Sequence, residues 1–357
     1  MNLPRITILA TLLMTVPAAA QLQITPPVAT PSPAAPEKPK AKPHTITKKK
    51  EATPAPKPSP SASPSPAPAA TVIPAPQPDN PNVDLVFGAY QRGMYKTAFD
   101  LAIARAKTGD AKAMTMLGEL YSNAMGIRRD YAKALEWYKR ASDAGDREAM
   151  FALAMLRMSG RGGPVDKGEA VKLMASAAKL GEPKAAYNLA LLYLDGQTLP
   201  QDLKRSAELL RQAADAGLPE AQYALATFYK EGTGVAKDPE RSVRLLQAAS
   251  LADNVDAEVE YAIAMFNGTG TPKNQPAAVA LLRKASRQGS AIAQNRLAWV
   301  LINGMGVPAD KIEGFKWHLV AKTGGKGDPD LDKQLSDLPA EDRAKAENAA
   351  KKWLGTK

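Results

Sequence analysis

The chain has no cysteine among its 357 residues, which excludes disulfide bonds and thiolate metal sites. Histidine is nearly as scarce, since only His44 and His318 are present, and aromatic residues make up 6% of the sequence. The sequence also lacks a Gly-x-Ser-x-Gly elbow, a His-Glu-x-x-His helix motif and a phosphate-binding loop. These absences leave no residues to nominate for catalysis. We therefore predict that the chain is not an enzyme and holds no cofactor and no metal.

The first 20 residues have the pattern of a secretory signal peptide. Arg5 precedes an apolar run at 6–16, and three alanines at 18–20 offer a cleavage site before Gln21. The run is shorter than the roughly 20 apolar residues that cross a bilayer. We expect cleavage after Ala20 and a periplasmic or secreted location, with retention as a membrane anchor as the alternative.

Residues 21–83 are rich in proline, alanine and lysine. They hold 18 of the 30 prolines and almost no large apolar residues, so they predict a disordered linker. In polyproline geometry, at about 3.1 Å per residue, the linker would extend on the order of 190 Å. It contains seven lysines but only three acidic residues, Glu37, Glu51 and Asp79, so it is basic. Export argues against nucleic acid as the counterpart, which leaves an anionic cell-wall polymer or a solvated spacer.

A residue pattern recurs every 36 residues in the rest of the chain. At this step alanine occurs six times in the series that begins at Ala113 and six times in the series that begins at Ala141, and a closing glycine follows the second helix in most units. Each unit contains two apolar stripes at helical spacing, separated by a glycine-rich turn that ends in an acidic residue or asparagine. That last residue is predicted to cap the second helix; the six caps are Asp130, Asp166, Asp202, Asp238, Asn274 and Asp310. Strict repetition of a helix-turn-helix unit predicts a solenoid.

At these residues the chain resembles the Sel-one-like repeat (SLR) family, a branch of the tetratricopeptide-like α/α solenoids. The matching pattern is Ala-x-x-x-Leu-Gly/Ala-x-x-Tyr, then Gly-x-Gly-Val-x-x-Asp, then Ala-x-x-Trp-Tyr-x-x-Ala and Gly, and it is fullest at 113–145 and 221–249. The resemblance covers residues 111–325 and implies an all-α superhelical solenoid that mediates protein–protein interactions. Two residues depart from the pattern: Ala124 replaces the first turn glycine of its unit, and Asp253 replaces a closing glycine.

The expected organisation has five parts. They are a signal peptide at 1–20, a disordered linker at 21–83, a tetratricopeptide-like helix pair at 84–110, six Sel-one-like repeats at 111–325 and C-terminal capping helices at 326–357.

Three features that suggest chemistry have simpler explanations. His318 occupies a helix position that elsewhere carries Tyr138, Met174 or leucine, so we interpret it as a packed side chain rather than a catalytic base. The six capping residues lie one repeat apart and do not converge as a carboxylate pair. The stretch Gly324-Gly325-Lys326-Gly327 lacks the spacing of a phosphate loop and indicates a helix end.

A binding surface remains as the candidate site. In tetratricopeptide-like geometry, one row of each first helix faces the concave groove, and these rows carry apolar, aromatic and amide side chains. Core packing between repeats is the alternative for each of them. We expect Leu191, Tyr223 and Trp299 to be exposed to solvent. The candidate partner-binding residues are Phe151, Met155, Tyr187, Asn188, Leu191, Tyr223, Thr227, Ile263, Asn295 and Trp299.

The sequence thus predicts a non-enzymatic periplasmic scaffold or adaptor whose concave groove takes a protein or peptide segment. A cell-wall (peptidoglycan) associated structural protein, acting through the basic linker, and a regulator of an envelope enzyme are the alternatives. We expect no nucleic-acid partner and no transmembrane segment after signal cleavage.

Overall fold

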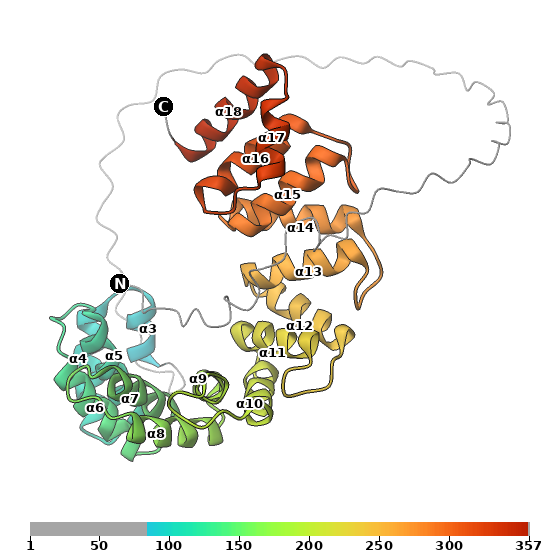
Figure 1. The fold of residues 1–357 in the computed structure, drawn as a ribbon. Coiled ribbons are helices and arrows are strands. Elements are labelled where there is room, and N and C mark those ends of the chain that lie inside the picture. Colours follow the sequence, from blue (N-terminus) through green and yellow to red (C-terminus); the bar gives the residue numbers. More distant parts are fainter. Residues whose placement is uncertain (1–83, 356–357) are drawn as a thin grey trace, which may run out of the picture. The chain divides into compact units, whose positions relative to one another are not determined.

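The computed structural model describes residues 84–355. The predicted signal peptide at 1–20 and linker at 21–83 lie outside the described residues. Residues 84–355 form 16 α-helices and no β-strand, which confirms the all-α solenoid. From α3 to α16, successive helices pack against one another in chain order (Figure 1). Among the described helices, none is long and apolar enough to cross a membrane.

Each repeat contributes a first and a second helix of 13 residues. The first helices are α5 (Ala111–Asn123), α7 (Arg147–Ser159), α9 (Pro183–Asp195), α11 (Pro219–Glu231), α13 (Val255–Asn267) and α15 (Ala291–Asn303). The second helices are α6 (Tyr131–Asp143), α8 (Lys167–Lys179), α10 (Leu203–Asp215), α12 (Pro239–Leu251), α14 (Gln275–Arg287) and α16 (Lys311–Thr323). The helices α3 (Leu85–Gln91) and α4 (Tyr95–Ala106) precede the repeats, and α17 (Pro329–Ser336) and α18 (Ala340–Leu354) follow them.

The turn within each repeat is built by its polar and glycine residues. All six predicted caps accept a hydrogen bond from a backbone N–H in the first turn of the second helix, at 2.8–3.1 Å. Each first helix ends in a residue with left-handed backbone geometry. Glycine fills five of these six ends, because it alone adopts that geometry without steric cost.

Ala124 is the exception at the end of α5, where its φ is 59°. An L-residue in this region costs about 1–2 kcal/mol, and part of that cost is offset by the lower entropy of alanine in the unfolded chain. We expect Ala124→Gly to raise the free energy of unfolding by up to about 1 kcal/mol, measured by urea denaturation. The reverse change at the equivalent Gly160, Gly160→Ala, should lower it. A loss of stability in Ala124→Gly would contradict this account of the turn.

Small residues allow the two helices of a repeat to approach closely. A Cβ atom added to Gly118 would lie 2.6 Å from the ring of Tyr138 on α6, so any larger residue there would clash. Alanine fills the same position in the other five first helices, at Ala154, Ala190, Ala226, Ala262 and Ala298, and all five are fully buried. The second-helix alanines are packed in the same way, as Ala213 illustrates.

Ala213 on α10 provides a test of this helix register. Because its side chain is fully buried against neighbouring helices, Ala213→Leu should overpack the core and cost about 1–3 kcal/mol of unfolding free energy. Ala216→Leu is the matched control, since Ala216 is exposed at the end of the same helix. Equal melting midpoints for the two variants would show that the register is wrong.

The last two helices cover the end of the stack. Helix α18 packs on α16, where Trp317 and Trp353 meet edge to face with ring centroids 5.0 Å apart. His318 is fully buried on α16, as the sequence predicted, and its Nε2 lies 2.8 Å from Oδ1 of Asp332 on α17. Lys322 and His318 together hold the pKa of Asp332 below its usual value. These contacts fix α17 and α18 to the sixth repeat.

Candidate functional site

The candidate surface consists of two rows of side chains on the first helices. The row that runs from Phe151 to Asn295 and the row that runs from Met155 to Trp299 each take one residue from α7, α9, α11, α13 and α15. We call these together the first-helix rows. Eight of the ten predicted residues are half-buried: Phe151, Met155, Tyr187, Asn188, Leu191, Tyr223, Thr227 and Ile263.

The first row is already buried at Val259 on α13, and both rows are covered at α15. Trp299 is 9% exposed and Asn295 is 8% exposed, and both contact the segment that leads into α17. The indole Nε1 of Trp299 donates to Oδ2 of Asp328 at 2.9 Å, and Nδ2 of Asn295 donates to the carbonyl of Lys326 at 3.3 Å. The expected solvent exposure of Trp299 is therefore wrong. The C-terminal capping segment occupies the place that we assigned to a partner.

Several polar groups near the rows bind the chain's own backbone. Nδ2 of Asn188 donates to the carbonyl of Lys184 at 2.8 Å, and Oγ1 of Thr227 donates to the carbonyl of Tyr223 at 3.2 Å. Farther round α11, Nε2 of Gln222 donates to the carbonyl of Ala214 in the preceding repeat at 3.3 Å. The amides of Asn188 and Gln222 therefore serve the fold, and one N–H of each amide remains for other contacts.

Two tyrosines on adjacent first helices lie next to carboxylates. Burial, together with the negative charge of Glu220, raises the pKa of the Tyr187 phenol. Burial likewise raises the pKa of Tyr223, with added contributions from Glu260 on α13 and other acidic residues on α11 and α13. Both phenols stay protonated at neutral pH. They are O–H donors on a half-buried apolar surface.

Three charged residues lie on the first helices α11, α13 and α15, near the rows. Nζ of Lys230 lies 2.7 Å from Oε2 of Glu260. Burial lowers the pKa of Arg296 on α15 to about 10, against the opposing effect of the acidic Glu260 and Asp328. Arg296 is thus still cationic at neutral pH. The sequence interpretation missed Glu260 and Arg296, although these two occupy one repeat position that elsewhere carries methionine, alanine or asparagine.

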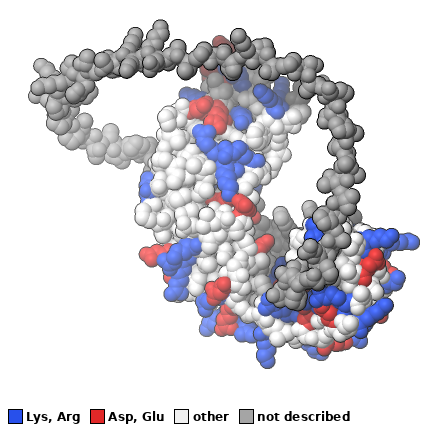
Figure 2. Space-filling model, turned by 180° about the vertical axis from the view of Figure 1, so that it is seen from behind, with Lys and Arg blue, Asp and Glu red and all other residues white. Residues whose placement is uncertain are grey.

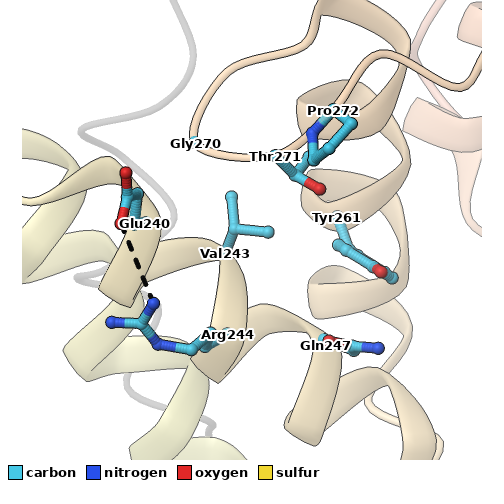
Figure 3. A pocket seen from close by; sticks show the side chains of 8 residues that line it. All are labelled: Glu240, Val243, Arg244, Gln247, Tyr261, Gly270, Thr271 and Pro272. Atoms are coloured by element: carbon cyan, nitrogen blue, oxygen red, sulfur yellow. Dashed lines mark ion pairs between the residues drawn. The ribbon is translucent and has the colours of Figure 1, made fainter.

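A separate pocket of about 480 Å³ lies between α12, α13 and the turn that follows α13 (Figure 3). It forms where one repeat departs from the others. Tyr261 stands at a position that carries leucine in the other five repeats, and Thr271 replaces the turn valine of Val235 and Val307. Glu240 and Arg244 form an ion pair at 4.0 Å along its rim. The pocket is lined by a phenol, an amide and an ion pair. These groups can bind a polar side chain, but they do not form a catalytic arrangement.

The described residues provide no catalytic constellation. Within 84–355, no three His, Asp or Glu side chains cluster in a way that would hold a metal ion. His318 contacts Asp332 but is fully buried, and His44 lies outside the described part of the chain. On the face shown in Figure 2, basic and acidic side chains are interspersed with wide uncharged areas. What the first-helix rows offer chemically is a contact surface.

Comparison with known proteins agrees with this architecture. The Sel1 repeat profile matches six successive segments, 111–146, 147–182, 183–218, 219–254, 255–290 and 291–325. Sel1 repeat solenoid proteins typically mediate protein–protein interactions. No curated protein matches the chain.

Two solved structures are similar to this chain. The first is the protective antigen c5321 of uropathogenic Escherichia coli, which displays an SLR fold and is 27% identical with a TM-score of 0.64. The match covers 73% of this chain and 56% of that one, so this chain spans only about half of the antigen. The second is a Sel1 repeat protein from Oxalobacter formigenes, which is 25% identical with a TM-score of 0.61 over 67% of this chain and 98% of that one.

Proposed function

Because the chain belongs to the Sel1 repeat family, we propose that it is a non-enzymatic scaffold or adaptor that binds a protein segment along its first helices. The observation that carries this proposal is the half-buried second row, which continues over four successive repeats through Met155, Leu191, Thr227 and Ile263. Family resemblance supports a protein partner, and the residue types on the rows support a contact surface.

The chemistry of the rows favours a partner with apolar side chains and a free backbone carbonyl. Leu191 is half-buried on α9 and lies one helical turn from Tyr187. Leucine and aromatic side chains in such a row provide the anchors that dominate protein interfaces, and the tyrosine O–H groups provide directional contacts at their edge. An amphipathic helix or an extended segment would present suitable groups.

The expected place of action is the periplasm. The signal-like residues 1–20 support export, and the proline-rich residues 21–83 support a tether between the solenoid and any attachment of its N-terminal end. A scaffold in the periplasm, which lacks a general ATP supply, needs only binding energy to hold its partners.

A site-specific crosslinking experiment tests the proposed function. A photoreactive amino acid is placed at Leu191 or Ile263 on the first-helix rows, and at Lys204 as the control, because Lys204 is exposed on the second helix α10. We expect illumination of producing cells to give the same discrete protein adduct from positions 191 and 263 and none from 204. Adducts of equal yield and identity from all three positions would contradict binding along the first helices.

A further inference from the structure

The pocket between α12 and α13 lies in a repeat that departs from the other five. Each of those five repeats carries a leucine at the position of Tyr261, and every one of these leucines is at most 5% exposed. Tyr261 is only half-buried. A phenol inside such a core needs a hydrogen-bond partner, and the hydroxyl group of Tyr261 has none among the described residues. The ring therefore stays at the edge of the core, where it lines the pocket.

A second edge of the pocket is formed by a closely packed turn. Gly270 has a φ of 69°, which glycine adopts without steric cost, and a Cβ atom added to it would overlap the carbonyl oxygen of Pro239. The turn that follows α13 therefore packs directly on the start of α12, and it places Thr271 and Pro272 at the pocket. Because Thr271 stands where the neighbouring repeats have valine, the pocket gains a second hydroxyl group.

Three uncharged polar groups that line the pocket are left without an internal partner. They are the hydroxyl groups of Tyr261 and Thr271 and the side-chain amide of Gln247, and none of them makes a hydrogen bond to another described residue. In two other repeats the position of Gln247 carries Arg211 and Arg283, and both of these donate to a side chain of the solenoid. Hydroxyl and amide groups each donate and accept hydrogen bonds. The pocket therefore matches ligand groups that do the same.

The two charged residues that line the pocket offset each other. Glu240 and Arg244 lie one turn apart on α12 and form an ion pair at 4.0 Å. Figure 3 shows this pair along α12, with Val243 between it and Tyr261 on α13. A charged ligand would find only charges that are already paired, whereas a neutral ligand needs no counter-charge. The lining therefore favours a neutral ligand.

The apolar groups and the volume of the pocket narrow the ligand further. Its apolar part consists of the Tyr261 ring, the buried Val243 and Pro272. The volume of about 480 Å³ lies within the range of small-molecule pockets and leaves room for more than one side chain. A sugar ring combines a face of C–H groups with hydroxyl groups at its edge. An acetamido group adds an amide that can pair with the amide of Gln247, and a methyl group for the apolar lining.

We propose that the pocket between α12 and α13 binds a neutral N-acetylated amino sugar, either free or as one residue of a glycan strand. The sugar ring packs on Tyr261, the acetamido group bonds to Gln247, and a sugar hydroxyl group bonds to Thr271. The pocket shares no residue with the first-helix rows, so this ligand is additional to the protein partner proposed above.

The repeats supply variants that preserve the fold. Tyr261→Leu and Thr271→Val each introduce the residue that neighbouring repeats carry, and Gln247→Ala truncates an exposed side chain. Lys139→Ala is the matched control, because Lys139 is exposed at the same repeat position as Gln247, on α6. We expect each of the four variants of the full chain to keep the helical circular-dichroism signal and a melting midpoint no lower than that of the unmodified chain.

Saturation-transfer NMR with N-acetylglucosamine as the probe measures the binding. We expect a Kd of roughly 1 mM for the unmodified chain, because one sugar ring offers few contacts. Each of the three pocket variants should raise this Kd about tenfold or more, and the control should leave it unchanged. The β-1,4-linked tetramer of the same sugar distinguishes the two sources. Clearly tighter binding of the tetramer assigns the pocket to a glycan strand, and equal affinity assigns it to the free sugar.

Charged analogues test the preference for a neutral ligand. Glucosamine, which carries an ammonium group, and glucuronic acid, which carries a carboxylate, should bind at least about tenfold more weakly than the probe. Three results would each overturn the proposal: no saturation transfer to the probe at ten times the expected Kd, equal Kd values for the pocket variants and the control, or equal binding of a charged analogue. Crosslinking of a protein at Leu191 does not involve the pocket, so failure here leaves the proposed function to its own test.

Discussion

Trp299→Ala is expected to lower the free energy of unfolding by about 3–5 kcal/mol. The indole is 9% exposed and packs in the C-terminal core with Leu297, Phe315 and Leu331. Its Nε1 donates to Asp328, whose other carboxylate oxygen caps the first turn of α17. The truncation would leave a cavity and remove a hydrogen bond to a cap, and both effects act in the same direction. Urea denaturation followed by circular dichroism measures the loss.

Trp353→Ala is the matched control for this prediction. Trp353 is also a C-terminal tryptophan, but it is 44% exposed on α18. Its truncation should cost clearly less than that of Trp299, because less apolar surface leaves water on folding. Equal costs for the two variants, or a Trp299→Ala protein of unchanged stability, would show that Trp299 is a surface residue and that the rows continue to α15.

The local structure of each repeat could be predicted from the sequence. The 36-residue period fixes which residues of each helix meet its neighbours, and the side chains at 130, 166 and the equivalent positions cap the second helices as predicted. These features depend on contacts within a repeat or between adjacent repeats, so a short stretch of sequence contains both partners. The burial of His318 follows from the same equivalence of positions.

The candidate surface was less predictable, because its boundary depends on what covers it. Asn295 and Trp299 occupy the same repeat positions as Tyr223 and Thr227, yet the segment at 326–328 covers only the former pair. That segment does not belong to the 36-residue pattern, so repeat equivalence gives no information about where it packs. The hydrogen bond of Gln222 to the preceding repeat is likewise a matter of side-chain geometry that periodicity does not specify.

The first and second helices of the repeats differ in charge. This difference is encoded in the sequence, but it becomes apparent only when charges are counted within the bounds of each helix. Counted over a whole repeat, acidic and basic residues largely cancel. Counted by helix, α11 and α13 are acidic and α9 has no net charge, while every second helix of the repeats is basic. Net charge alone therefore says little about how charge is distributed over the two helix layers.

The double variant Leu191→Ala with Tyr223→Ala has the largest expected effect on binding. These two side chains lie in adjacent first-helix rows and are half-buried without a side-chain hydrogen bond to any described residue. Truncation of an interface anchor typically costs a complex about 2 kcal/mol or more, which corresponds to roughly a 30-fold rise in Kd. Tyr223 also packs against a buried cluster that includes Ala226 and Leu246, so we expect a modest loss of stability as well.

The control is Leu180→Ala with Leu251→Ala, which truncates two exposed leucines at the ends of second helices. It removes a comparable amount of apolar surface from the opposite helix layer. It should leave both the Kd and the melting midpoint nearly unchanged.

The most direct test of binding along the first helices is therefore the Kd of both double variants for the protein that crosslinks at position 191, measured with melting curves on the same samples. The account predicts that Leu191→Ala with Tyr223→Ala weakens binding at least about 30-fold while the chain remains folded and helical, and that the control binds as the unmodified chain does. A folded variant with unchanged Kd, or a variant that unfolds, would contradict it, because these side chains would then belong to the core or to no interface.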